Sequence, residues 1–94
     1  MARSAVVEVG GDIDFSSEPM FEAALAVAGV GETGVVVDLE AVDFIGAGGV
    51  AALQRAATRA RLAGRPFALR HPSPTVRRML DVLSSTADLP VEEG

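Results

Sequence analysis

The sequence predicts a layered α/β domain, with a mixed but mostly parallel β-sheet of about four or five strands and helices packed against it. Short runs rich in valine alternate along the chain with segments of helical periodicity. Gly, Pro and Ser residues separate these segments. The 94 residues, 49% of them hydrophobic, suffice for one core. We therefore expect a single domain over residues 1–94.

The first segments predict strand, strand and helix. Residues 5–9 (AVVEV) have the β-branched composition of a strand, and the glycine pair that begins at Gly10 interrupts it. Residues 12–14 are then expected to form a second short strand or a hairpin arm. Ser16 or Ser17 is expected to cap the helix that follows, with Pro19 in its first turn and Gly29 at its end. Its apolar positions are Met20, Phe21, Ala24, Leu25 and Ala28.

The middle of the chain predicts a buried strand and a second helix. Residues 34–39 (GVVVDL) form a nearly continuous apolar run, which is typical of a strand covered on both faces. Residues 40–45 are expected to be a connector. The pattern from about Ala47 to Leu62 is helical, and Gly64 is its stop signal. The apolar side of this helix consists of Val50, Leu53, Ala57 and Ala60.

The last third predicts a strand, a helix and a short edge strand. Residues 65–71 (RPFALRH) form the strand, and residues 89–91 (LPV) the edge strand. Ser73 is expected to cap the helix, with Pro74 at its first position. Right-handed crossovers would then place the helices against a mostly parallel sheet. The apolar stripe of this helix consists of Val76, Met79, Leu80 and Leu83.

Charge and composition exclude several classes of function. The net charge is −5, whereas a protein that binds nucleic acid directly carries a basic field. The sequence has no cysteine, so disulfides and thiolate zinc sites are excluded. The N-terminus is too short and too soon charged for a signal peptide, and no apolar run spans a bilayer. We expect a soluble, cytoplasmic protein that does not insert into membranes.

Catalytic and metal sites are not expected. His71 is the single histidine, and no carboxylate cluster stands beside it in the sequence. Asp12, Asp14 and Asp43 are candidates for an acid–base pair, but their spacing does not bring two of them together. The serines lack a histidine partner, because His71 precedes Pro72 in a turn-like stretch. We expect no enzyme, no catalytic residue, no metal and no cofactor.

The glycine loop at Gly46–Gly49 raises one alternative, a nucleotide-binding domain. Residues 46–51 (GAGGVA) fit the pattern G-x-G-x-x-A, follow an apolar segment and open a helix, whose free N–H groups favour anions. The motif lies in the middle of the chain, however, and no acidic residue follows about 20 positions later. A P-loop is excluded because the sequence has no lysine.

Three phrases of the sequence resemble the STAS domain family, in particular bacterial anti-sigma factor antagonists. They are GDIDFSSEPMFEAAL, VVVDLEAVDFIGAGGVAAL and LRHPSPTVRRMLDVL, and the resemblance covers nearly the whole chain. It implies a STAS-like layered fold for residues 1–94. It also implies a protein–protein interaction module that takes part in partner switching and regulates transcription through sigma factors.

The resemblance breaks at the phosphoacceptor motif D-S-x-G of the antagonists. Gly46 takes the position of the Asp, Ala47 that of the Ser, and Gly49 matches the Gly. No Ser or Thr stands between Val42 and Leu53, so a small misalignment restores no acceptor. The resemblance therefore implies docking without phosphorylation control at this loop. The partner-binding residues that it implies are Asp14, Gly46, Ala47, Gly48 and Gly49.

Simpler roles for these residues stay open. Asp14 is either part of the docking surface or a residue that assists Ser17 at the helix start. Gly46 and Gly49 are also compatible with a purely conformational role. The resemblance implies an anti-sigma factor of the kinase type as partner. The alternatives are an accessory subunit of a transporter or signalling complex, and the nucleotide-binding domain. A short first strand with an exposed edge also suggests a weak homodimer.

Overall fold

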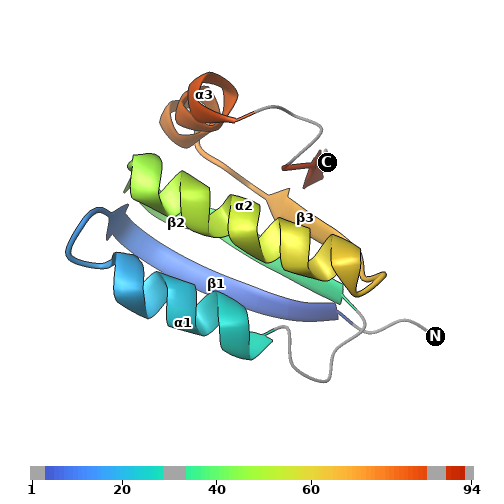
Figure 1. Ribbon diagram of the computed structural model, residues 1–94. Coiled ribbons are helices and arrows are strands. Elements are labelled where there is room, and N and C mark those ends of the chain that lie inside the picture. Colours follow the sequence, from blue (N-terminus) through green and yellow to red (C-terminus); the bar gives the residue numbers. More distant parts are fainter. Residues whose placement is uncertain (1–3, 29–33, 85–88, 93–94) are drawn as a thin grey trace.

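The structure, a computed structural model, describes residues 4–28, 34–84 and 89–92 (Figure 1). In these residues strands and helices alternate along the chain. The elements are β1 (Ser4–Ile13), α1 (Glu18–Ala28), β2 (Gly34–Ile45), α2 (Ala47–Leu62), β3 (Phe67–Arg70), α3 (Pro74–Leu83) and β4 (Val91–Glu92). This alternation confirms the predicted α/β layered class.

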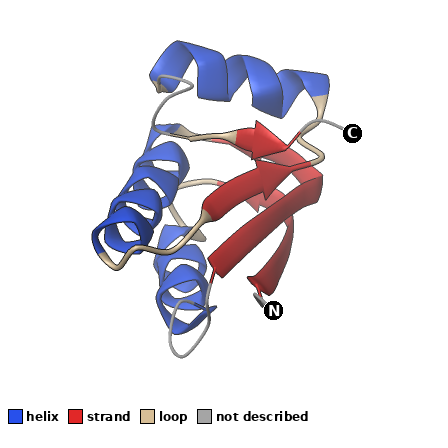
Figure 2. Ribbon diagram, turned by 90° about the vertical axis from the view of Figure 1, so that its right-hand side faces the viewer, coloured by secondary structure: helices blue, strands red, loops and turns tan. Residues whose placement is uncertain are grey.

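The four described strands form one sheet in the order β1-β2-β3-β4, and each neighbouring pair is parallel. Right-handed crossovers between strands that follow one another across a sheet place their helices on the same face. Helices α1 and α2 accordingly lie side by side on one face, and α3 lies at the end of the sheet (Figures 1 and 2). The opposite face carries no helix from the described part of the chain.

The first two strands are longer than predicted. The glycine pair does not break β1, because Gly10 and Gly11 still pair with Ala41 and Val42. The register instead shifts twice, once between Glu8 and Gly10 and once after Gly11. The expected second strand at residues 12–14 is therefore the end of β1, and the expected connector at residues 40–45 is the end of β2. Each segment is held in the sheet by the other.

The core lies between the helices and the covered face of the sheet. Alternate residues of β2 face the helices and are fully buried, for example Val37 and Leu39. The predicted apolar side of α2 is buried as expected, with Val50 and Leu53 almost without solvent contact. Helix α3 contributes mainly Val76 and Leu80. Leu83 is exposed and Met79 only partly buried, so the predicted stripe of α3 is narrower than its spacing indicated.

The predicted boundaries of α2 and α3 are confirmed. Helix α2 ends before Gly64, whose φ of 70° is the left-handed conformation that glycine adopts without strain. The Ser73 hydroxyl caps α3 by accepting the amide of Val76 at 3.2 Å, and Pro74 is the first helical residue. Strand β3 is shorter than the range expected at residues 65–71. Strand β4 begins two residues later than the range expected at residues 89–91. Gly29, the expected end of α1, lies outside the described residues.

Candidate functional site

Two loops meet at one end of the sheet, and residues from both form the candidate site (Figure 1). The loop of residues 14–17 follows β1, and Gly46 joins β2 to α2. The strands bring them together because Ile13 and Ile45 are register partners. The amide of Gly46 donates to the carbonyl of Ile13 at 3.0 Å. The geometry thus places Asp14 and Gly46, two residues that the sequence singled out, in adjoining loops.

Asp14 organises the first loop. Its Oδ1 accepts the Ser16 hydroxyl at 2.8 Å and the Ser16 amide at 3.1 Å. These bonds, with weaker ones from Ser17, lower the pKa of Asp14, so the carboxylate carries its charge at neutral pH. The predicted serine cap is wrong in its detail. The Ser17 hydroxyl accepts the Asp14 amide and donates to the Asp12 carbonyl, so it holds the loop closed and does not cap α1.

The start of α2 is packed against two other elements. Gly46 is the N-cap residue and makes no side-chain cap bond. A Cβ at Gly48 would collide with the Glu18 carboxylate of α1, whereas one at Gly49 would stand 2.7 Å from Ile45 and 2.8 Å from Ile13. Gly49 is buried, so its role is to let the helix approach the core. Because the Glu18 carboxylate lies over Gly48, a binding partner would have little access to Gly48.

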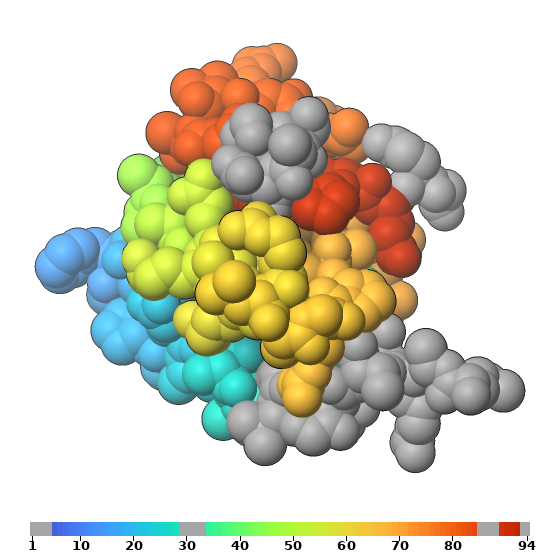
Figure 3. All heavy atoms as spheres, turned by 45° about the vertical axis from the view of Figure 1, so that its right-hand side comes forward, coloured from blue at the N-terminus to red at the C-terminus, as the bar shows by residue number. Residues whose placement is uncertain are grey.

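Three large apolar side chains are exposed at or near this end, and sequence reasoning missed them. Phe15 is 89% exposed at the tip of the first loop, and Met20 is 79% exposed on α1. Phe44 is 41% exposed, and its ring lies next to Gly46. Figure 3 shows the first loop, in blue, standing out from the surface. The available signal for Phe15 was its place in a short serine-containing loop, whereas helical spacing alone assigned Met20 to the core.

Ala47 is the first residue of α2 and is exposed. A side chain at this position reaches solvent at the free N–H end of the helix, where an anion is favoured. The methyl group of alanine has no hydroxyl to accept a phosphate. The nearby Ser16 and Ser17 hydroxyls are bound to Asp14 and the backbone. We call Asp14, Phe15, Phe44, Gly46 and Ala47 the two-loop surface.

The glycine loop is poorly suited to bind a nucleotide phosphate. The Glu18 carboxylate occupies the space over Gly48, at the helix end where an anion would bind. A second negative charge there is disfavoured by the first. The start of α2 therefore already has a carboxylate of the chain beside it.

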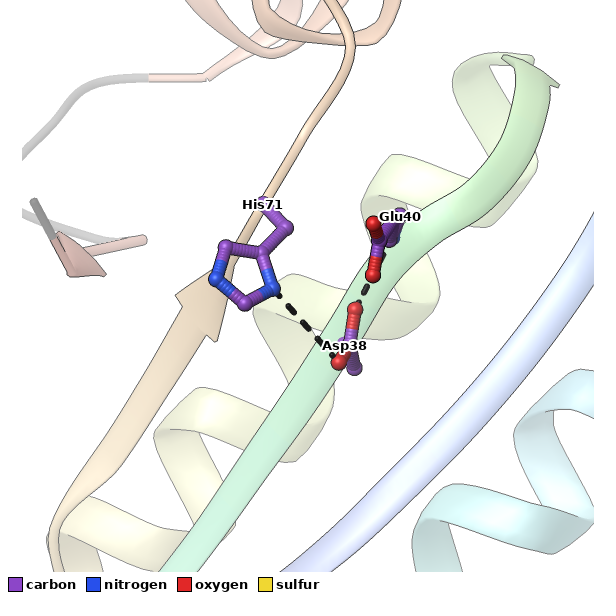
Figure 4. Close-up of side chains that lie close together, drawn as sticks. All are labelled: Asp38, Glu40 and His71. Atoms are coloured by element: carbon purple, nitrogen blue, oxygen red, sulfur yellow. Dashed lines mark hydrogen bonds and ion pairs between the residues drawn. The ribbon is translucent and has the colours of Figure 1, made fainter. Parts of the chain in front are cut away.

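His71 lies close to carboxylates in the fold, although none stands beside it in the sequence. The fold brings His71, which follows the last residue of β3, to Asp38 and Glu40 in the middle of β2 (Figure 4). The His71 Nδ1 lies 3.6 Å from Asp38 Oδ2. This proximity depends on the pairing of two parallel strands, which local sequence signals do not report. Asp12 and Asp43, by contrast, make no carboxylate pair in the described residues.

Comparisons with solved structures show the fold. The antagonist SpoIIAA in its unphosphorylated form superposes with a TM-score of 0.76 at 18% identity, covering 99% of this chain and 83% of that one. An anti-sigma factor antagonist from Mycobacterium paratuberculosis gives 0.79 at 26% identity, covering 97% and 78%. The murine anion transporter Slc26a9 gives 0.78 at 16% identity, where the match covers 97% of this chain but 16% of the transporter.

Sequence comparison gives the family. No curated protein matches the chain. No helix in the described ranges has the length and apolar character needed to cross a membrane. The sequence model of the STAS domain matches residues 2–93, and the parallel sheet with three helices in the described residues agrees with it. The chain therefore belongs to the STAS domain family.

Proposed function

We propose that this STAS domain is a docking module of the anti-sigma factor antagonist type. It binds an anti-sigma factor of the kinase class in the bacterial cytoplasm and so regulates transcription, without being switched by phosphorylation at the α2 loop. The observation that carries the proposal is the two-loop surface, on which an exposed phenylalanine and an ionised aspartate project from a rigid end of the sheet. The likeness to the mycobacterial antagonist, at 26% identity over 97% of the chain, supports it.

The chemistry of the two-loop surface suits protein docking better than small-molecule binding. Exposed aromatic side chains are typical anchors of interfaces, because they bury much area with little loss of conformational entropy. Phe15 projects from a loop that three hydrogen bonds to Asp14 Oδ1, from the Ser16 hydroxyl and the amides of Ser16 and Ser17, hold in one shape. Such a preorganised loop loses little freedom on binding. The negative charges of Asp14 and Glu18 favour a partner with basic residues opposite them.

The absence of a switch follows from Ala47. In a relative with serine there, a phosphate would add about −1.5 to −2 charges at the centre of the surface. With alanine the surface keeps one charge state, so docking is governed by the partner's concentration and conformation.

A pull-down from the native host tests the proposal. The chain, immobilised through its C-terminus, is expected to retain a kinase-type anti-sigma factor, and Phe15→Ala is expected to weaken retention at least about tenfold, as for an interface anchor. The matched control is Leu62→Ala, which removes an equally exposed apolar side chain at the opposite end of α2. Retention that is lost equally in both variants, or the absence of any anti-sigma factor, would contradict the proposal.

The likeness to the STAS region of a transporter supports a second candidate, an accessory subunit of a transport or signalling complex. In that case the retained partner is a membrane protein or a larger scaffold. A weak homodimer through the edge strand β1 is a further expectation, because β1 has a neighbour on one side only in the described sheet. Sedimentation analysis at increasing concentration checks it.

A further inference from the structure

The helix-free face of the sheet carries a row of charged residues. Glu8, Asp38, Arg70 and Glu92 are register partners across β1, β2, β3 and β4. Residues paired in this way project from the same face of a sheet. Glu40 lies two residues beyond Asp38 on the same strand. With Glu40 included, four carboxylates and one guanidinium lie in this row, so negative charge is in excess.

Asp38 is the most unusual member of the row, since it is the buried charged residue of the described core, with 7% of its surface exposed. Its Oδ1 accepts the Glu40 amide at 2.9 Å, and its Oδ2 accepts Arg70 Nε at 3.0 Å. The Glu40 amide, followed by Arg70, lowers the pKa of Asp38, so it is ionised at neutral pH. Each oxygen of an ionised carboxylate has two lone pairs, and these bonds leave some of them free.

His71 completes the cluster. Its Nδ1 faces Asp38 Oδ2 at 3.6 Å, which is longer than a hydrogen bond (Figure 4). Two ligand atoms on a tetrahedral zinc ion stand about 3.4 Å apart, given bonds of about 2.0–2.1 Å. Ligand atoms of Asp38, Glu40 and His71 all lie within 4.8 Å of one another. Because Glu40 and His71 are exposed, small rotations of their side chains suffice to close the remaining gap.

We propose that Asp38, Glu40 and His71 bind a divalent transition-metal ion of the zinc type, with the fourth position left to water. One imidazole and two carboxylates are ligands that zinc accepts, whereas magnesium and calcium prefer oxygen alone. The site lies on the sheet face, away from the residues of the two-loop surface. It is independent of the function proposed above.

Arg70 competes with the metal for Asp38 Oδ2. The register gives this arginine a second carboxylate at Glu92 on β4. When a metal occupies Oδ2, we expect the guanidinium to turn towards the Glu92 carboxylate on the neighbouring strand. Removing the positive charge of Arg70 is expected to tighten metal binding, which is the opposite of the effect expected at the three ligands.

Titration of the untagged, chelator-treated chain with zinc chloride tests the site. His71 is the single histidine of the sequence, so the imidazole proton signals in the NMR spectrum report on it alone. We expect these signals to shift with 1:1 saturation, and calorimetry to give the same stoichiometry. His71→Gln and Glu40→Gln, both at exposed positions, should each weaken binding at least about tenfold. Arg70→Gln should bind as tightly or more tightly.

Asp43→Asn is the matched control, because Asp43 is an exposed carboxylate on the same strand outside the cluster. It should leave the zinc affinity unchanged within about twofold. No saturable shift of the His71 signals at millimolar zinc would overturn the proposal. So would binding that Glu40→Gln leaves unchanged, because the ion would then be held by His71 alone.

Discussion

The carboxylate of Glu18, in the first turn of α1, lies where a side chain at Gly48 would stand in the first turn of α2. Helix α2 has no side-chain cap of its own. A negative charge at a helix N-terminus stabilises the helix, typically by about 0.3–1 kcal/mol. Glu18 thus places a carboxylate of a neighbouring helix at the start of α2. From this relationship we expect two adjacent glycines in the first turn of α2, Gly48 and Gly49, to respond differently to substitution.

Gly49→Ala is expected to destabilise the domain by about 1–3 kcal/mol, as overpacking of a core does. The added methyl group would meet Ile45 at 2.7 Å and Ile13 at 2.8 Å, and both side chains are buried. Gly48→Ala would meet only the movable end of Glu18 and should change stability by less than about 1 kcal/mol. Urea unfolding of the two variants measures the difference, and equal losses would contradict this view of the loop.

Ala47→Ser is expected to restore an acceptor hydroxyl while leaving the free energy of unfolding within about 0.5 kcal/mol of the parent. The side chain is exposed, so the hydroxyl needs no partner within the protein. Incubation with the retained kinase-type partner and ATP should then add one phosphate to the variant but none to the parent, as mass spectrometry would show. The phosphorylated variant should bind the partner more weakly. A variant that still binds but is never phosphorylated would show that this partner does not act on the loop.

Asp38 is expected to make folding sensitive to acid. Its pKa is lowered in the folded protein from an ordinary value of 3.8, so its stabilising contribution is present above that pH. The contribution is lost as the pH falls through the lowered folded-state pKa. Urea unfolding between pH 6 and pH 3 should therefore show a shallower decline for Asp38→Asn than for the parent. Asp38→Asn should also cost about 1–3 kcal/mol at neutral pH, because Arg70 loses a charged partner. A decline of equal steepness in both proteins would rule out this role.

Ser73→Ala is expected to lower the free energy of unfolding by about 1 kcal/mol, since it removes the capping bond to the Val76 amide. Thr75→Ala is the control, because Thr75 is exposed in the same helical turn and has no capping role. Thermal unfolding of the two variants measures the difference in stability between them. Equal effects would mean that the cap contributes nothing beyond helix propensity.

The helices were predictable because their signals are local. Helix α2 runs from Ala47 to Leu62, as its periodicity indicated, and α3 begins with the Ser-Pro pair at Ser73. Cap, proline and periodicity all act within one or two turns. The alternation of strands and helices also predicted the parallel pairing of the strands, which the described sheet confirms.

The errors have one physical cause, which is contact between distant segments. The sequence predicted a separate arm at the end of β1, whereas this segment continues β1 and pairs with β2 through two register shifts. His71 looked isolated because Asp38 is more than thirty residues away in the sequence and one strand away in space. Met20 follows the helical period and yet faces solvent, because α1 buries only the side that includes Phe21 and Leu25.

The unequal length of the strands has a consequence for how such a domain can diversify. β3 pairs with residues 35–38 of β2, whereas β1 and β2 continue together to Ile13 and Ile45. The two loops therefore stand on a two-stranded extension beyond the four-stranded part of the sheet. Under the docking function proposed above, substitutions at the tip would change the docking surface while the strands that hold the core stay the same. On that proposal, a duplicate of such a domain would gain a new partner through changes at the tip alone.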